Sequence, residues 1–360
     1  MGPTEQTRIV QIHPTRRCNL RCRHCYSSSS PQEHDMLDVA LLFDAITDAT
    51  ALGYEWISFS GGEPLLYRPL PQLLHHAQTL GLHTALVTNG MLLDERHLEA
   101  ITPYIDLIAI SIDGVPESHN RIRAHEGAFE KMASYLEDLR ERGMKFGFIF
   151  TLTQHNLHEL QWVADFALNQ GAKLLQIHPL DEVGHAIENM AGETPDQIEN
   201  AYAWMLGQQI QHAAGERLAV QVDLVFSDHL KAHPELFYAG EVLQEEGARL
   251  ADLLSPLVIE ADGTVVPLQY GFPRTYALGN LANARLNSLA TTWRHNSRAS
   301  FHALCHTAYE QVTSATPPRF VSWYDTLARL GRSFPSPAAD RGNIIFPTQR
   351  PVSFVQMNNR

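Results

Sequence analysis

Short apolar runs alternate with amphipathic segments through the first half of this chain of 360 residues. Each run is almost continuously hydrophobic, as expected for a strand that is buried on both faces. The predicted strands are residues 8–13, 56–60, 84–88, 107–112, 146–151 and 173–178, and the predicted helices between them are residues 36–52, 70–80, 94–101, 127–142 and 157–169. Strands that alternate with helices predict a parallel sheet, flat or curved into a barrel, with ligands beyond the carboxyl ends of its strands.

Three of the four cysteines lie close together, directly after the first predicted strand. Cys18, Cys22 and Cys25 have the spacing Cys-x3-Cys-x2-Cys. Thiols this close cannot all pair with one another as disulfides, so a soft metal or an iron–sulfur cluster is the natural ligand. Three ligands on a four-iron cluster would leave one iron open. The alternative is a structural zinc with His24 or His13 as its fourth ligand, although zinc motifs usually consist of two short pairs separated by a loop.

Followed by the aromatic residue Tyr26, this spacing resembles the signature of the radical S-adenosylmethionine (SAM) enzymes. The resemblance implies that the three thiolates hold a 4Fe-4S cluster, whose open iron chelates the methionine part of SAM. It implies that one electron then cleaves SAM to a 5′-deoxyadenosyl radical, and that Tyr26 packs beside the adenine end of the pocket. It also implies the fold, an α/β partial (β/α)6 TIM-like barrel that is open on one side.

The second predicted strand runs into Gly61, Gly62, Glu63 and Pro64. Two glycines let the backbone approach a ligand closely, and a carboxylate can hold an ammonium group. The stretch resembles the Gly-Gly-Glu-Pro motif of the same family, which implies that it binds the amino group of the methionine part of SAM. Without the cysteine triplet upstream, it would predict only a turn.

The remaining strand ends carry hydroxyl, amide and carboxylate groups, which suit the ribose hydroxyls and the methionine carboxylate of SAM. The resemblance implies that a histidine after the sixth strand contacts adenine. These candidates are Asn89, Ser111, Asp113, Thr153, Asn156 and His178. Ordinary turns at Asn89-Gly90 and Asp113-Gly114, and a structural role for the histidine, are the alternatives.

Two arginines, Arg121 and Arg123, follow the fourth predicted strand. A guanidinium at this position could bind a carboxylate of SAM or of a substrate, and Arg121 is the candidate. The alternative is a solvated face at the entry of a helix, and we favour that interpretation for Arg123.

Beyond residue 190 the alternation weakens. The sequence predicts helices at 194–214 and 228–236, a strand at 218–226, and a hairpin at Asp262-Gly263 within 255–268. The hairpin resembles the start of the SPASM or twitch extension of radical SAM enzymes, but Leu268 and Ala284 stand where that extension has cluster cysteines. We therefore expect three parts: a core barrel (1–190), a smaller α+β SPASM-like extension without an auxiliary cluster (191–312), and a mostly irregular tail (313–360) with a short helix at 323–330.

Cys305 stands alone on a predicted helix. Its ordinary interpretation is a small buried hydrophobe. The alternative is a catalytic role, in which its thiol donates a hydrogen atom to a substrate radical.

The composition of the chain bears on which partners it can bind and on its location in the cell. A net charge of −13 argues against nucleic acid as the main partner. The first residues contain no long apolar segment, so neither a signal peptide nor a membrane anchor is expected. Because three of the four cysteines belong to one motif, a reducing, cytoplasmic location is expected.

The family resemblance implies an enzyme that abstracts hydrogen from a substrate carbon. A ribosomally made peptide is the first choice of substrate, from the frequency of such substrates in the family. The alternatives are a small-molecule dehydrogenase or epimerase acting on a sugar, antibiotic or cofactor precursor, and a non-catalytic iron–sulfur protein for electron transfer or sensing. An external donor such as ferredoxin or flavodoxin is expected, because the chain has no apparent flavin or nicotinamide motif.

Overall fold

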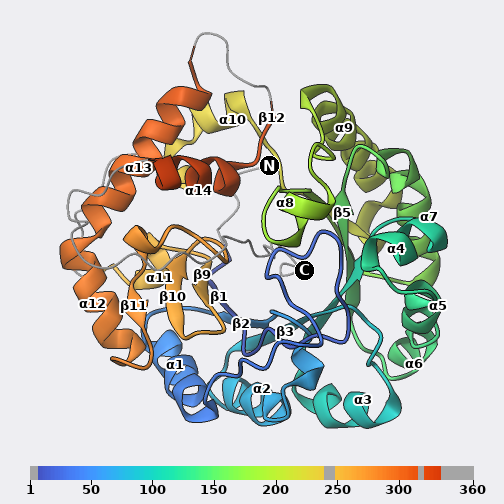
Figure 1. The fold of residues 1–360 in the computed structure, drawn as a ribbon, viewed down its shortest axis with the longest axis horizontal. Helices are drawn as coiled ribbons and strands as arrows, with labels where there is room; N and C mark the ends of the chain where they lie inside the picture. The colour runs from blue at the N-terminus through green and yellow to red at the C-terminus, as the bar shows by residue number, and fades with distance from the viewer. Residues whose placement is uncertain (1–6, 239–247, 315–319, 334–360) are drawn as a thin grey trace.

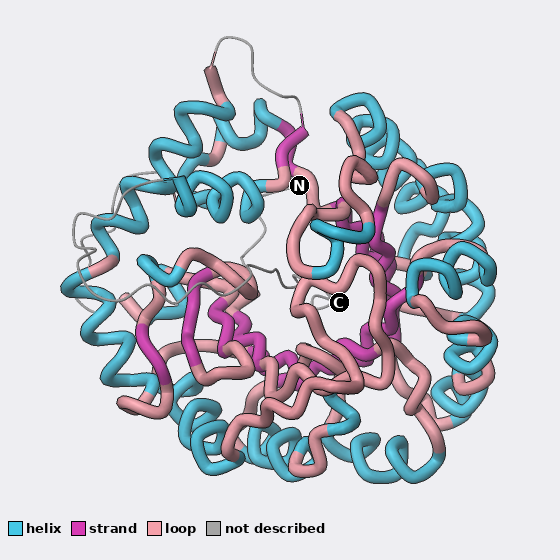
Figure 2. Tube along the Cα trace, in the orientation of Figure 1, coloured by secondary structure: helices cyan, strands magenta, loops and turns pink. Residues whose placement is uncertain are grey.

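The computed structural model describes residues 7–238, 248–314 and 320–333. Its centre is a ten-stranded sheet with the order β11-β10-β9-β1-β2-β3-β4-β5-β6-β7. Seven neighbouring strands are parallel, namely β1 (Ile9–Ile12), β2 (Trp56–Phe59), β3 (His83–Thr88), β4 (Leu107–Ile112), β5 (Phe146–Leu152), β6 (Leu174–Pro179) and β7 (Ala219–Val222). The sheet curves without closing, with helices around its outside (Figures 1 and 2). The predicted α/β partial barrel is confirmed.

The helices cover the outer face of the sheet, and the strand sequences explain why. This layer contains α1 (Val39–Ala51), α2 (Leu70–Thr79), α3 (Glu95–Ile101), α4 (Pro116–Arg123), α5 (Ala128–Ala133), α6 (Leu136–Glu141), α7 (Leu160–Gln170) and α9 (Gln197–Ala214). Along β5, Phe146, Phe148 and Phe150 belong to the core that the helices cover, whereas Ile149 belongs to a separate cluster. Because successive side chains of a strand point to opposite faces, the phenylalanines face the helices and Ile149 faces the barrel interior.

The structure differs from the predicted elements in three places. The predicted helix 127–142 is divided into α5 and α6, and α4 precedes it with Pro116 at its first turn. The predicted strand 218–226 is also divided: β7 extends the barrel beside β6, whereas β8 (Val225–Phe226) pairs with β12 (Phe320–Val321). The barrel sheet therefore gains a seventh parallel strand that lies beyond residue 190.

The predicted hairpin at Asp262-Gly263 is confirmed, and it joins the barrel sheet. β9 (Leu257–Ile259) pairs in parallel with β1, and β10 (Thr264–Pro267) pairs antiparallel with β9. β11 (Gly279–Asn280) completes this edge of the sheet. The carboxyl end of β9 therefore lies beside that of β1.

The other helices are mostly in the second half of the chain: α8 (His185–Asn189), α10 (Ser227–Ala232), α11 (Leu250–Leu253), α12 (Leu286–Asn296), α13 (Arg298–Val312) and α14 (Trp323–Ser333). The predicted helix 323–330 is α14, and the rest of the predicted tail, 315–319 and 334–360, lies outside the described residues. Among the described residues, no helix combines the length and the apolar character that crossing a bilayer requires.

Candidate functional site

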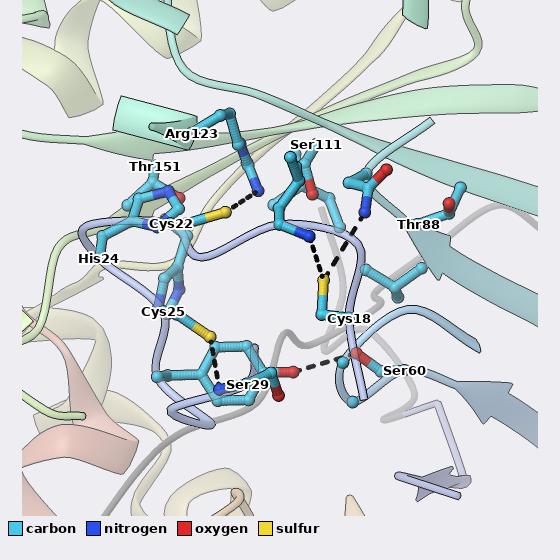
Figure 3. Close-up of a pocket in the computed structure, with 18 of the residues that line it drawn as sticks. Cys18, Cys22, His24, Cys25, Ser29, Ser60, Thr88, Ser111, Arg123 and Thr151 are labelled. Atoms are coloured by element: carbon cyan, nitrogen blue, oxygen red, sulfur yellow. Dashed lines mark hydrogen bonds between the residues drawn. The ribbon is translucent and has the colours of Figure 1, made fainter. Parts of the chain in front are cut away.

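A pocket opens at the carboxyl ends of the parallel strands, where the loop after β1 crosses the barrel. It is lined by Cys18, Leu20, Cys22, His24, Cys25, Tyr26, Ser29, Ser60, Gly61, Gly62, Val87, Thr88, Asn89, Ser111, Arg123, Ile149, Thr151, His178, Leu180, Asp181 and Val183. Figure 3 shows the three cysteines on one loop, with Ser111 and Arg123 across from them. The predicted candidates that the fold brings together here are the three cysteines with Tyr26, Gly61, Gly62, Asn89, Ser111 and His178.

The three thiols receive hydrogen bonds from N–H groups. The backbone N–H of Leu20 donates to Cys18 Sγ at 3.4 Å, and that of Ser29 donates to Cys25 Sγ at 3.3 Å. Arg123 Nη1 donates to Cys22 Sγ at 3.8 Å (Figure 3). Burial raises the pKa of Cys22 to about 12, so in the metal-free chain this thiol keeps its proton and a metal must displace it. Donors of this kind stabilise sulfur once it carries negative charge.

The donor set and the loop backbone fit an iron–sulfur cluster. Gly62 packs against the cysteine loop so closely that an added Cβ would lie 2.2 Å from the carbonyl oxygen of Arg17, so glycine is required. In the described ranges, no three Cys, His, Asp or Glu side chains converge as a site for a single ion. The two histidines considered as zinc ligands have other surroundings: His24 Nε2 lies 3.1 Å from Asp113 Oδ1, and the buried His13 ring lies 4.7 Å from that of Tyr270.

Glu63 is buried and does not line the pocket, and its predicted contact with the ammonium group of SAM stays a prediction. Its fully buried carboxylate accepts hydrogen bonds from Thr88 Oγ1 at 2.9 Å, from Asn89 N at 3.0 Å and from Leu65 N at 3.1 Å. Burial raises its pKa to about 7. Pro64 begins a short 3-10 turn and does not line the pocket either. Glu63 therefore joins the glycine turn to the end of β3, and the two glycines present the backbone to the pocket.

Asp113 is also placed behind the wall, where it holds two residues that do line the pocket. Its carboxylate accepts from Arg123 Nε at 2.5 Å and Nη2 at 3.1 Å, and it faces His24. Burial alone would raise the pKa of Asp113, but Arg123 and His24 hold it well below its ordinary value. This buried ion pair orients the guanidinium of Arg123, and the predicted contact of Asp113 with ribose stays a prediction.

The two arginines of α4 have the opposite placement to the one we predicted. Arg123 is 7% exposed and lines the pocket, whereas Arg121 is exposed and donates from Nη2 to Ser118 Oγ at 3.2 Å. Residues two apart on a helix are about 200° apart around its axis, so only one of them can face the pocket. Helical periodicity, applied to a helix recognised at Pro116, could have found Arg123.

Thr153 and Asn156 are buried and do not line the pocket. Asn156 Oδ1 accepts from Thr153 N at 2.7 Å, and its Nδ2 donates to the carbonyls of Asp113 and Thr151, each at 2.9 Å. Asn156 thus ties the end of β4 to the end of β5. Thr151, two residues earlier than the predicted threonine, lines the pocket.

The other wall of the pocket comes from β6 and from the tyrosine after the cysteine triplet. His178 Nδ1 lies 2.9 Å from Asp223 Oδ2, so this histidine is held by a carboxylate at the end of β7. The hydroxyls of Tyr26 and Ser60 lie 3.0 Å apart. Seven further polar residues that line the pocket were not assigned to the SAM site from the sequence, namely His24, Ser29, Ser60, Thr88, Arg123, Thr151 and Asp181. Ser60 and Thr88 could have been found from the sequence, because each is a hydroxyl residue at or just after the end of a predicted strand.

Cys305 does not line this pocket. It is fully buried on α13 and belongs to the main hydrophobic core. Burial raises the pKa of its thiol. The ordinary interpretation as a small buried hydrophobe holds, and the hydrogen-donor role has no support from its position.

Comparisons with known proteins point to one family for the first half of the chain. A family model described as the Radical SAM superfamily matches residues 12–167. Fe-coproporphyrin III synthase of Methanosarcina barkeri is 31% identical over 159 residues, which are 44% of this chain and 40% of that protein. PqqA peptide cyclase of Xanthomonas campestris pv. campestris is 24% identical over 318 residues, or 87% of this chain and 80% of that protein.

Two solved structures share the fold. Streptococcus suis SuiB bound to S-adenosylmethionine superimposes with a TM-score of 0.60 and 15% identity, covering 86% of this chain and 68% of SuiB. anSMEcpe with bound AdoMet and Kp18Cys peptide superimposes with a TM-score of 0.63 and 17% identity, covering 90% of this chain and 96% of that one. With its cysteine triplet lining the pocket of a partial barrel, the part of the chain from residue 12 to residue 167 matches the radical SAM superfamily, and the chain is an enzyme.

Proposed function

We propose that Cys18, Cys22 and Cys25 hold a 4Fe-4S cluster at which SAM is cleaved reductively. When bound, the cluster supplies the electron that breaks a carbon–sulfur bond of SAM, and the resulting 5′-deoxyadenosyl radical takes hydrogen from a substrate carbon. The observation that carries this proposal is the common pocket of the three thiols and the Gly61-Gly62 turn.

The pocket offers groups that suit the polar parts of SAM. The glycine turn presents backbone to the methionine end, and the guanidinium of Arg123 suits its carboxylate. Asp113 orients that guanidinium, and Glu63 holds the glycine turn. Tyr26 and His178 remain our candidates for the adenine end. The protein's part is therefore to bind and orient SAM in a site sheltered from water.

We infer that the substrate is a ribosomally made peptide. The PqqA peptide cyclase matches most of this chain, and structures with the same fold include SuiB bound to precursor peptide SuiA and anSMEcpe with bound peptides. A small molecule is the second candidate, which the identity to Fe-coproporphyrin III synthase over the barrel core supports.

We propose that residues 1–190 form the core with the cluster site, and that residues 191–312 form a SPASM-like extension without an auxiliary cluster, which also adds β7, β9, β10 and β11 to the barrel sheet. Leu268 is fully buried in the main hydrophobic core, and Ala284 packs against that core. The cluster would then receive its electron from an external donor of the ferredoxin or flavodoxin type. All four cysteines are free thiols, which supports a reducing, cytoplasmic compartment.

The test is SAM cleavage without oxygen. The chain is reconstituted with iron and sulfide, SAM and dithionite are added, and 5′-deoxyadenosine is measured by chromatography. We expect 5′-deoxyadenosine from the wild type and none from Cys22→Ala. An intact cluster that yields no 5′-deoxyadenosine would favour the non-catalytic iron–sulfur protein. Adding short peptides encoded beside the gene, and following their mass, tests the substrate class.

A further inference from the structure

The cysteine loop turns its thiols inward and its arginines outward. Cys18 and Cys22 are each 7% exposed, whereas their neighbours Arg17 and Arg21 are exposed. The side chain of Arg23 is 35% exposed. Each of these arginines is next to a proposed cluster ligand in the sequence, so its Cα atom lies about 3.8 Å from that of a cysteine.

The end of α4 adds one more outward arginine. The backbone N–H of Arg23 donates to the carbonyl of Ile122 at 2.9 Å, which places the loop beside the last turn of this helix. Within that turn, Arg123 points inward to Cys22 and Arg121 is exposed. We define the arginine face as Arg17, Arg21, Arg23 and Arg121.

The four arginines of this face stand on a chain that is acidic as a whole. The chain has 40 Asp and Glu and a net charge of −13, yet residues 6–32 contain none of these acids. Arg23 lies 3.5 Å from Glu193, and the neighbouring Arg16 is paired with Glu33 and Asp35 outside this face. Within the described part of the chain, no carboxylate forms an ion pair with the other three arginines of the face. Their charge is available to a partner.

We propose that the arginine face docks an acidic protein that donates one electron to the cluster. The inference rests on the proposed function, which requires an external reductant. The rate of electron tunnelling falls steeply with distance. A donor therefore transfers its electron fastest when it docks on the residues that are next to the cluster ligands. An acidic donor is repelled by the net charge of −13, and a local positive face offsets this repulsion and orients the encounter.

The proposed step transfers a single electron and nothing else. The reduced donor, a flavin hydroquinone or a reduced iron–sulfur centre, loses one electron, and the oxidised cluster gains it. No bond forms or breaks and no proton is required in the transfer itself. The arginines act by docking the partner, so the chemistry in the pocket does not depend on them.

The test follows cluster reduction in the reconstituted holoenzyme. Flavodoxin hydroquinone is mixed anaerobically with wild type, with Arg21→Glu/Arg121→Glu and with Arg142→Glu, and the loss of visible cluster absorption is timed. Arg142 is an exposed arginine at the end of α6, and Arg142→Glu is the control for a single charge reversal elsewhere on the surface. We expect the double variant to be reduced about tenfold more slowly, with Arg142→Glu near wild type. Dithionite should reduce all three proteins at one rate.

Ionic strength provides a second readout. The wild-type rate with flavodoxin should fall as salt rises from about 50 to about 500 mM, because screening weakens the attraction. In the double variant this dependence should vanish or reverse, because the net repulsion remains. If the charge-reversed variant binds less iron, Arg21→Gln/Arg121→Gln replaces it, with the same expected direction.

Three outcomes would overturn the docking proposal: an unchanged flavodoxin rate in the double variant, equal slowing in Arg142→Glu, or a wild-type rate that rises with salt. Weaker binding of a poly-glutamate peptide together with an unchanged flavodoxin rate would assign the face to an acidic peptide instead, and would also overturn it. A wild-type cluster that dithionite reduces without cleaving SAM would contradict the proposed function, whatever the flavodoxin rates are.

Discussion

Two loops leave the same edge of the sheet, one after β1 and one after β9, and they are built differently. The strands pair in parallel, and the backbone N–H of His13 donates to the carbonyl of Ile259. After β1, the chain presents thiols to a pocket and surrounds them with N–H donors. After β9, the carboxylate of Glu260 accepts from the backbone N–H of Gly271 and pairs with Arg274, inside the extension itself.

The contrast shows how two neighbouring loops can share a sheet edge and differ in what they offer a ligand. The cysteine loop has hydrogen-bond donors aimed at sulfur. The β9–β10 hairpin is followed by Leu268, which is fully buried although its φ is +64°, a conformation that costs a bulky residue about 1–2 kcal/mol. Its apolar side chain fills space where the family resemblance implies a ligand. The residue types therefore separate a pocket of thiols and hydrogen-bond donors from a packed connection.

Removing one sulfur from the cysteine loop should have the largest effect. Cys22→Ala is expected to lose its visible absorption and nearly all of its iron, because two thiolates cannot hold the cluster. Cys305→Ala, in the core, is the control and should keep wild-type iron, as measured by iron and sulfide content after anaerobic reconstitution. A Cys22→Ala protein with full iron would show that the loop is not the cluster site.

The second prediction compares the loss of stability when each of two buried carboxylates, Asp113 and Glu260, is replaced by its amide. Asp113→Asn leaves the buried Arg123 without its charge partner and should lower the free energy of unfolding by about 3–5 kcal/mol. Glu260→Gln leaves Arg274, whose side chain is 45% exposed, and should cost about 1 kcal/mol or less. Anaerobic urea unfolding followed by circular dichroism measures both. Equal losses would mean that the ion pair beside the cysteine loop is no more important than that of the hairpin.

Glu63→Gln should affect SAM chemistry while leaving the cluster in place. The amide can accept from only one side, so one of the donors at Thr88, Leu65 or Asn89 loses its partner at a cost of about 1–3 kcal/mol. We expect formation of 5′-deoxyadenosine to slow by about ten- to a hundredfold, with iron unchanged. Turnover at the wild-type rate would remove Glu63 from the site.

The smallest effect on iron is expected from the hairpin region. The wild type should bind about four irons per chain, and Ala284→Ser should leave that number unchanged, because neither Leu268 nor Ala284 can ligate iron. The measurement is iron and sulfide content against protein by amino-acid analysis. About eight irons per chain would reveal an auxiliary cluster, and the loop after β1 would then not be the only cluster site.

The local pattern of residues was sufficient to predict the strands of the core barrel and the position of the cysteine loop. β1 to β6 lie within a residue or two of their predicted ranges, because continuous apolar runs report burial on both faces directly. The three cysteines and the glycine turn line one pocket, as their places after the first two strands predict. Asp113, Thr153 and Asn156 were recognised as strand-end polar groups, but they support the pocket wall instead of lining it.

The sequence by itself determined which segments are strands and which residues can hold a cluster, since both depend on side-chain type and short spacing. Only the tertiary structure decided that Arg123 faces the pocket and Arg121 does not, and that Glu63 and Asp113 act as braces. It also decided that Val10 lies beside Leu257, a pairing of residues far apart in the chain. Such contacts depend on how the helices and strands pack, and no local pattern of residues encodes that packing.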